Sequence, residues 1–218
     1  MTLTAVSRHL SAVLFDTAMA PLEVLRLRRI RRRLISTASG AVLEVGAGTG
    51  ANLPFYDPGL VASLTTTDVD DRRTVLDARA LRVNPRLARR MDSARIDAQR
   101  LPFADGVFDT VVATLVFCSV PCAPCGFDEI ARVLKPGGRY LFLEHVRPAH
   151  PRMAAAFDAI NPVWNGISRG CNLNRDTLDT LATAGFRTET VHRDRNGVFV
   201  WGCATPPALS ARESRSRD

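Results

Sequence analysis

A glycine-rich turn directly follows an apolar run in this chain and restricts the folds that are open to it. Residues 42–52 read VLEVGAGTGAN. Glycine adopts positive φ without a steric penalty and lets a ligand lie against bare backbone. A buried strand that leads into such a turn and then a helix is typical of the ligand-binding edge of a doubly wound sheet. We therefore expect Gly46, Ala47, Gly48 and Gly50 to contact a ligand that contains a nucleoside.

The remainder of the chain alternates between strand and helix patterns. Apolar or β-branched runs predict strands over residues 41–45, 62–67, 93–96, 108–117, 139–146, 186–192 and 198–203. Amphipathic runs predict helices over residues 71–83, 126–134 and 175–184. Asn196 and Gly197 favour a tight hairpin between the last two strands. The expected fold is α/β, a doubly wound and mostly parallel seven-stranded sheet with an antiparallel last strand.

The length of 218 residues suits one domain with short additions at its ends. We expect a helical cap over residues 1–39, the main domain over 40–205 and a disordered polar tail over 206–218. Residues 147–174 contain three prolines and are expected to form an irregular insert that acts as a substrate lid. The cap carries two helical patterns, over residues 11–20 and 22–35.

The second cap pattern separates apolar from basic side chains. Leu27, Ile30 and Leu34 share one face, whereas Arg29, Arg32 and Arg33 lie opposite. The simpler interpretation is a surface helix with a solvated arginine face, and the alternative is an interfacial helix that contacts anionic lipid or a partner. The net charge of +7 permits nucleic-acid binding, but no basic stretch is interleaved with aromatic residues, so no nucleic-acid partner is expected.

Composition also bears on location. No apolar run approaches the roughly 20 residues that cross a bilayer, and the N-terminus lacks the pattern of a signal peptide. The five cysteines are an odd number in a long chain, which suits a reducing compartment. We expect a cytoplasmic protein, with peripheral membrane contact through the arginine-rich helix as the alternative.

The glycine turn alone leaves two cofactor classes open. Gly46, Gly48 and Ala51 satisfy the dinucleotide pattern G-x-G-x-x-G/A, and positions 46, 48 and 50 satisfy G-x-G-x-G. Asp68 ends the second predicted strand and could accept from ribose hydroxyls of either ligand. Neither tyrosine has a lysine four residues later, as a short-chain dehydrogenase would need, although other hydride-transfer enzymes stay open.

Further segments favour the second class. Glu44 precedes the turn by two residues, Asp97 and Ala98 follow the third predicted strand, and residues 101–109 and 130–139 read LPFADGVFD and IARVLKPGGR. In these segments the chain resembles class I S-adenosylmethionine-dependent methyltransferases with a methyltransferase type 11 domain.

The resemblance implies a Rossmann-like methyltransferase fold and S-adenosylmethionine as cofactor. It implies that Glu44 organises the loop near the methionine part, that Asp68 accepts from the ribose, and that Asp97 and Ala98 contact the adenine. Asn52 and Thr114 complete the set of cofactor residues that the resemblance suggests.

Three stretches resemble a narrower group. They read EVGAGTGANLPFY over residues 44–56, TLVFCSV over 114–120, and EHV over 144–146 with the later NPVW and GCNLNR. Together they are similar to thiol S-methyltransferases, which methylate alkyl thiols and are membrane-anchored. More broadly, the chain resembles ubiquinone and menaquinone C-methyltransferases. The resemblance covers about residues 41–203, and the chain lacks the apolar N-terminal anchor of the thiol group.

The expected activity is therefore methyl transfer to a small, lipophilic acceptor. A thiol is the first choice, and C- or O-methylation of a quinone-like or phenolic molecule is the second. A nucleotide- or RNA-binding module without chemistry is the alternative from another class. The partner is the small-molecule acceptor, and no obligate protein partner is inferred.

Candidate acceptor residues follow from their place at strand ends and in the insert. His145 ends the fifth predicted strand and is the candidate base, although a histidine bonded to local backbone is an equal alternative. The candidate substrate contacts are Phe117, Cys118, Trp164, Cys171 and Asn172.

A cysteine cluster also invites a metal interpretation. Cys118, Cys122 and Cys125 have the spacing C-x3-C-x2-C, but no clear fourth ligand accompanies them apart from Cys171 or His145 as candidates. We therefore expect no metal site.

Overall fold

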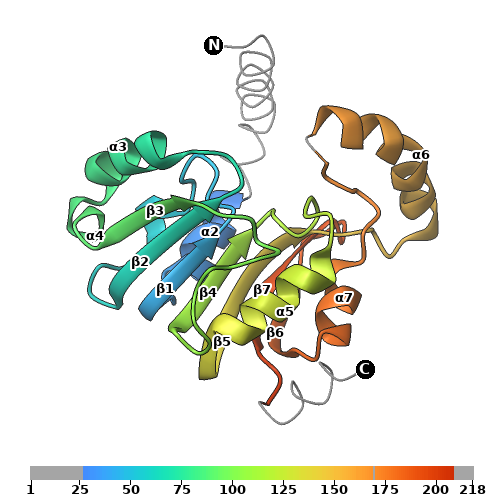
Figure 1. Cartoon of the computed structure of the whole chain (residues 1–218). Coiled ribbons are helices and arrows are strands. Elements are labelled where there is room, and N and C mark those ends of the chain that lie inside the picture. The colour runs from blue at the N-terminus through green and yellow to red at the C-terminus, as the bar shows by residue number, and fades with distance from the viewer. Residues whose placement is uncertain (1–26, 169, 209–218) are drawn as a thin grey trace.

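A computed structural model describes residues 27–168 and 170–208. Its centre is a seven-stranded sheet in the order β3-β2-β1-β4-β5-β7-β6 (Figure 1). The strands are β1 (Gly40–Val45), β2 (Val61–Asp68), β3 (Met91–Arg95), β4 (Phe108–Thr114), β5 (Leu134–His145), β6 (Arg187–Arg193) and β7 (Phe199–Thr205). β7 pairs antiparallel with β5 and with β6, whereas the other pairs are parallel. The expected sheet with its antiparallel last strand is confirmed.

Helices cover both faces of the sheet because neighbouring strand residues point to opposite sides. The described helices are α2 (Arg28–Ile35), η2 (Leu53–Phe55), α3 (Arg73–Val83), α4 (Pro85–Ala88), α5 (Ala123–Val133), α6 (Pro151–Ile167) and α7 (Thr177–Thr183). One core lies between the sheet and α5 with α7, and the other lies between the sheet and α2, α3 and α4. α6 stands apart from these layers at the upper right of Figure 1.

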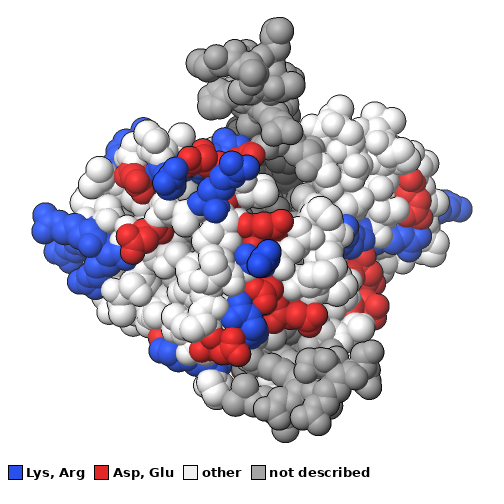
Figure 2. Space-filling view, viewed as in Figure 1, with Lys and Arg blue, Asp and Glu red and all other residues white. Residues whose placement is uncertain are grey.

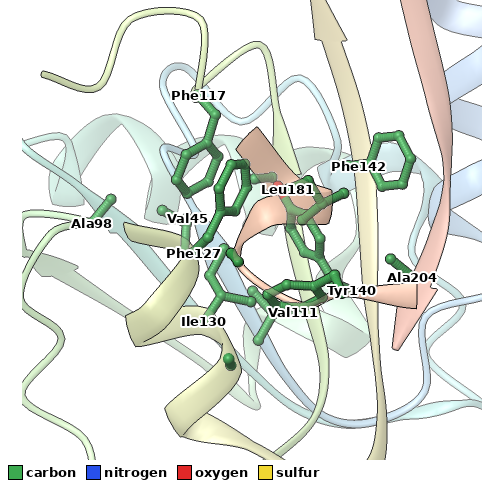
Figure 3. Close-up of a cluster of buried hydrophobic side chains, with 14 of the residues drawn as sticks. Val45, Ala98, Val111, Phe117, Phe127, Ile130, Tyr140, Phe142, Leu181 and Ala204 are labelled. Carbon is green, nitrogen blue, oxygen red and sulfur yellow. The ribbon is translucent and has the colours of Figure 1, made fainter. Parts of the chain in front are cut away.

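Aromatic rings fill the first core. Phe117 stacks on Phe127 of α5 with ring centroids 4.2 Å apart, and Tyr140 and Phe142 of β5 continue the cluster (Figure 3). Phe117 is fully buried there. The residue that we expected to contact the acceptor therefore anchors the loop after β4 in the core instead.

Two sequence expectations differ from the structure around the glycine turn. No α-helix follows the turn; the short η2 is all that forms, because Pro54 opens it and Pro58 disfavours helical backbone at Asp57. The fourth strand ends at Thr114 rather than at residue 117, because Leu115 has a φ of +60°. This positive φ turns the chain away from the sheet.

The insert after β5 is also different. We expected irregular structure over residues 147–174, but α6 spans 17 residues of it and holds Pro162 inside the helix. Pro151 suits the first helical turn, where a missing N–H costs nothing, and residues 153–156 read MAAA. The helix continues through Pro162 to Ile167.

Parts of both chain ends lie outside the residues that the structure describes. The expected helix over residues 11–20 and most of the expected tail over 206–218 fall outside the described residues. α2 confirms the end of the second cap helix, with Arg29, Arg32 and Arg33 exposed. Contact of this face with lipid stays a prediction. Within residues 27–168 and 170–208, no helix has both the length and the apolar character that a membrane span requires.

Candidate active site

A cavity of about 510 Å³ opens where the carboxyl ends of the parallel strands meet. β1 has β2 on one side and β4 on the other, so the strand order reverses there, and ligands of doubly wound folds bind at this switch point. Of the expected site residues, those that line the cavity are Gly46, Gly48, Asp68, Asp97, Ala98, Cys118, His145, Trp164 and Cys171. Those that do not line it are Glu44, Ala47, Gly50, Asn52, Thr114, Phe117 and Asn172.

The glycine turn forms one wall. Gly46 and Gly48 have φ values of +65° and +56°. A Cβ on Gly46 would collide with Val116, whereas a Cβ on Gly48 would meet no atom within 4 Å. The backbone N–H of Gly48 donates to Asp68 Oδ2 over 2.8 Å. Gly48 therefore presents bare backbone to the cavity while a carboxylate holds the turn in place.

A buried polar cluster supports the turn from below. Asn52 Nδ2 donates to Glu44 Oε1 over 2.8 Å and to Thr114 Oγ1 over 3.0 Å, and the Tyr56 hydroxyl donates to Glu44 Oε2 over 2.7 Å. Burial raises the pKa of the Glu44 carboxyl, although these hydrogen bonds act in the opposite direction. Glu44, Asn52 and Thr114 thus fasten the turn to the ends of β1 and β4 without lining the cavity.

Arg31 belongs to this cluster, and the sequence analysis missed it. Its Nη1 donates to Asn52 Oδ1 over 2.7 Å and to Thr114 Oγ1 over 2.5 Å, and the side chain is only 5% exposed. The signal was its spacing, four residues after Leu27 and three before Leu34, which places it on the apolar face of α2. A charged residue on that face needs buried partners, and the cluster supplies them.

Two carboxylates face the cavity from β2 and from the segment after β3. Asp68 accepts from the backbone N–H of Gly48 and, through Oδ1, from that of Asp70 over 3.0 Å. Asp97 accepts from the backbone and side-chain amides of Gln99 over 2.9–3.0 Å. Gln99 Oε1 in turn accepts from the N–H of Cys122 over 2.8 Å. These hydrogen bonds hold both acids in place at the cavity wall, where they can accept from hydroxyl or amino groups.

The loop after β4 forms the opposite wall, and Glu144 holds it. The Glu144 carboxylate accepts from the backbone N–H groups of Val116, Phe117 and Cys118 over 3.1–3.2 Å. Glu144 reaches under the loop and does not line the cavity, whereas the next residue, His145, does. Burial raises the pKa of Glu144 to about 8.

His145, Trp164, Cys171 and Leu173 line the far end of the cavity together with Phe199. The His145 ring stacks on Phe157 of α6 with centroids 5.8 Å apart. Burial lowers the pKa of His145 to about 4, so the imidazole is neutral at neutral pH. Of the described residues at this end, none is a lysine, arginine, aspartate or glutamate. The far end thus suits an apolar, uncharged molecule.

The segment after α6 is fastened to the β4 loop. Asn172 donates from its backbone N–H and from Nδ2 to the carbonyl of Cys118, over 2.8 and 3.1 Å. Arg175 Nη1 donates to the carbonyls of Phe117 and Val120 over 2.7 and 2.5 Å. Asn172 and Arg175 therefore position Cys171 against the cavity rather than contacting its contents.

The cysteine cluster does not form a ligand set. Cys122 and Cys125 are joined by a disulfide at the start of α5, a pairing that the sequence analysis did not predict. Cys118, Cys171 and Cys203 are free. Within residues 27–168 and 170–208, no group of three histidine, cysteine or acidic side chains is placed to hold a metal ion.

Comparisons with known proteins point to one family. A family model described as a methyltransferase domain matches residues 43–142. The chain is 36% identical over 155 residues to thiol S-methyltransferase TMT1B of Homo sapiens, and the match covers 70% of this chain and 63% of that protein. It is 30% identical over 206 residues to phosphatidylethanolamine N-methyltransferase of Cereibacter sphaeroides, and the match covers 92% of this chain and 97% of that protein. It is 29% identical over 199 residues to the ubiquinone/menaquinone biosynthesis C-methyltransferase UbiE of Pseudomonas putida, and the match covers 80% of this chain and 77% of that protein.

Solved structures share the fold. An S-adenosylmethionine-dependent methyltransferase from Mesorhizobium loti has a TM-score of 0.60 at 18% identity, covering 81% of this chain and 95% of that one. Geranyl diphosphate methyltransferase in complex with SAM has a TM-score of 0.63 at 15% identity, and the match covers 81% of this chain and 82% of that one. The chain spans about 60% of the length of the thiol S-methyltransferases that it matches.

Proposed function

This chain belongs to the methyltransferase family, and we propose that it transfers the methyl group of S-adenosylmethionine to a small lipophilic thiol. The observation that carries the proposal is the composition of one cavity. Its near end combines bare glycine backbone with the carboxylates of Asp68, Asp70 and Asp97, of which Asp70 is paired with Arg72, and its far end is apolar and holds a neutral histidine and two cysteines. The near end suits a nucleoside, and the far end suits an uncharged acceptor.

The residues at the near end fit S-adenosylmethionine. The open space beside Gly48 accommodates a ligand against the backbone. Asp68 and Asp97 offer carboxylate oxygens to ribose hydroxyls and to an adenine amino group, and Ile96 and Ala98 offer apolar contact beside them. When bound, this cofactor supplies a methyl group that its positively charged sulfur already activates.

The chain's own residues then have to orient the acceptor and exclude water. A nucleophile reacts fastest when it is held in line with the breaking bond at about 3–3.5 Å. Glu144 fixes the β4 loop through three backbone hydrogen bonds, and this loop lies between the two ends of the cavity. We propose that α6 with its following segment closes the far end as a lid, because Trp164 and Cys171 line the cavity from there.

The surface around the lid agrees with a lipophilic acceptor. α6 carries a single arginine and a single aspartate, and Ile160, Val163 and Ile167 are exposed on it. Figure 2 shows that the surface over α6 is largely uncharged, whereas charges gather over the opposite side near α3 and α4. An apolar acceptor would enter past this surface without crossing fixed charges.

Thiol methylation is favoured over the alternatives by the thiol S-methyltransferase relatives at 33–36% identity. The second candidate is C-methylation of a quinone-like molecule, which the UbiE relatives support at lower identity. O-methylation of a phenol would use the same apolar end of the cavity.

The test is transfer of labelled methyl from S-adenosylmethionine to a panel of alkyl thiols, quinone precursors and phenols by the purified chain. We expect a labelled methyl thioether from alkyl thiols. Label in a quinone or phenol product, with none in the thiols, would establish the second candidate instead. Salt-dependent RNA binding without transfer to any acceptor would contradict the enzyme and favour a binding module.

A further inference from the structure

The disulfide between Cys122 and Cys125 lies where the β4 loop leads into α5. Cys122 directly precedes the helix, and its Sγ accepts from the backbone N–H of Cys125 over 3.3 Å. Residues 118–121 line the cavity and end directly before the disulfide. Glu144 therefore holds the beginning of this loop, and the disulfide holds its end. The covalent state of the two cysteines bears on one wall of the cavity.

A chain of hydrogen bonds runs from Cys122 to a carboxylate of the site. The backbone N–H of Cys122 donates to Gln99 Oε1 over 2.8 Å, and Gln99 Nε2 donates to both oxygens of Asp97 over 3.0 Å. Asp97 and Gln99 both line the cavity. Because a backbone N–H keeps its direction only while its own residue is held, the orientation of the Asp97 carboxylate depends on the conformation of Cys122.

The first turn of α5 is fixed by packing as well as by the disulfide. Ala123 is 3% exposed and belongs to the first core. Gly126 lies so close to Phe117 that a Cβ would approach the ring to 2.6 Å. Pro124 lies in the first turn, where its fixed φ favours the helix. Opening of the S–S bond therefore frees the two cysteine side chains and the backbone at Cys122, whereas α5 stays in place.

Exposure and spacing make this disulfide open to exchange. Cys125 is exposed and Cys122 is half-buried. The bridge joins residues only three positions apart. A disulfide stabilises a fold by closing a loop, and the effect grows with the length of the loop, so this bridge contributes little to stability. Exposed disulfides are the ones that exchange with small thiols. The pair thus has the properties of a redox-active disulfide rather than of a structural one.

We propose that Cys122 and Cys125 form a redox-active site for small thiols, and that the oxidised pair, through Gln99, orients Asp97 for the cofactor. The second part rests on the proposed function. A thiolate attacks Cys125 Sγ, the S–S bond breaks, and its electron pair stays on Cys122 Sγ. A second thiolate attacks the sulfur now joined to Cys125 and releases Cys125 as a thiolate. The two small thiols leave as one disulfide, and two electrons and two protons have passed to the cysteines.

The first test follows the redox state without any cofactor. The full chain is equilibrated with glutathione at a series of reduced-to-oxidised ratios. Free thiols are then trapped with N-ethylmaleimide in denaturant and located by mass spectrometry of the peptides. We expect Cys122 and Cys125 to gain the label together as the ratio rises, whereas Cys203, which is free, carries it in reduced glutathione throughout. Label on both cysteines in oxidised glutathione alone, or on neither in reduced glutathione alone, would overturn the proposal.

The second test measures whether the redox state reaches the cofactor. S-adenosylhomocysteine is titrated calorimetrically into the chain in reduced and in oxidised glutathione, because this ligand has no methyl group to transfer to the thiol. We expect binding to be about 3- to 10-fold weaker in the reduced state, the effect of one lost hydrogen bond. A variant with Cys122→Ser and Cys125→Ser keeps a residue that caps α5, and should bind like the reduced wild type in both buffers. Cys203→Ser is the control and should keep the full difference.

Gln99→Leu tests the route between the disulfide and the carboxylate. It should weaken binding to the oxidised chain and remove the difference between the two states. A difference that persists in this variant would overturn the role of Gln99. Equal affinity of the two states of the wild type, or tighter binding by the reduced state, would overturn the link to the cofactor. If neither state binds S-adenosylhomocysteine, the proposed function fails, whereas the labelling still decides whether the two cysteines form a redox-active site.

Discussion

Gly46 and Gly48 both have positive φ, but their surroundings differ. A side chain on Gly46 would strike Val116 of the β4 loop, so this glycine keeps two parts of the protein in contact. A side chain on Gly48 would enter open space that belongs to the cavity. The first glycine serves packing and the second leaves room for a ligand, although both satisfy the same sequence pattern.

Substitution of Gly48 by valine should abolish cofactor binding while the chain stays folded. A Cβ at this position meets no atom within 4 Å, so the new side chain would extend into the space next to the turn, and the backbone strain at positive φ is matched in the control below. Titration calorimetry with S-adenosylhomocysteine measures the loss. Gly137→Val is the matched control, because Gly137 also has positive φ (+76°) and open surroundings but lies away from the cavity. Retained binding by Gly48→Val would contradict our placement of the cofactor.

Removal of the Asp68 carboxylate should weaken cofactor affinity by roughly 1–3 kcal/mol, through loss of charge-assisted hydrogen bonds. Asp68→Ala also frees the N–H of Gly48, so part of the effect acts through the turn. Asp71→Ala is the control, because Asp71 is exposed and pairs with Arg73 outside the cavity. A dissociation constant unchanged in Asp68→Ala would remove this residue from the site.

Two of the carboxylates that we expected at the site line the cavity. The position of Asp68 at the end of the second predicted strand indicated the first, and the family resemblance indicated Asp97; their roles toward the cofactor stay predictions. Arg31 and Glu144 were harder, because their partners are distant in sequence: Arg31 meets Thr114 across 83 positions. Such partners become visible only when the sheet brings β1, β4 and β5 together.

At the scale of elements, α2 is linked to the cofactor turn by one side chain. Leu27, Leu34 and Ile35 dock the helix on the sheet, and Arg31 reaches from the same face to Asn52 and Thr114. The helix thus supports the turn that contacts the ligand, and its exposed arginines are free for other contacts. Loss of Arg31 should therefore affect both the stability of the chain and the order of the turn.

Arg31→Met should lower the free energy of unfolding by about 1.5–3 kcal/mol, because it removes charged hydrogen bonds to buried partners. Urea denaturation at neutral pH measures the change. Arg32→Met, on the exposed side of the same helix, should stay within about 0.5 kcal/mol of wild type. Equal effects of the two substitutions would show that Arg31 is not held by the buried cluster.

The sequence patterns did not predict α6 or the end of β4 correctly. Prolines in residues 147–174 suggested irregular structure, yet a 17-residue helix forms around Pro162. The apolar run over residues 108–117 suggested one long strand, yet its last residues form the loop that Glu144 holds. In both cases, tertiary contacts or local helix propensity outweighed the pattern that we used.

At the scale of the whole molecule, the buried histidine makes stability depend on pH. The pKa of His145 falls from an ordinary 6.5 to about 4 on folding, so the unfolded chain binds more protons between these values. Stability from this group is present above about pH 6.5 and is lost as the pH falls towards 4. Glu144 acts in the opposite sense, because its pKa is raised to about 8 and the folded chain holds the extra proton.

The histidine contribution can be isolated by comparing variants. Between pH 6.5 and 4.5, the decrease in unfolding free energy should be smaller in His145→Gln than in the wild type by roughly 2 kcal/mol. Denaturant titrations at both pH values measure it. His192→Gln is the control, because His192 is exposed on β6. An identical decrease in wild type and His145→Gln would show that His145 is not buried in its neutral form.

The proposed function requires that the cavity at the glycine turn binds S-adenosylmethionine. The most direct measurement is calorimetric titration of the purified chain with S-adenosylmethionine and, separately, with NADH, since the turn satisfies the sequence patterns of both cofactor classes. We predict binding of one S-adenosylmethionine per chain and no heat of binding with NADH. Binding of NADH, with no response to S-adenosylmethionine, would show that this cavity is the site of a nicotinamide cofactor instead.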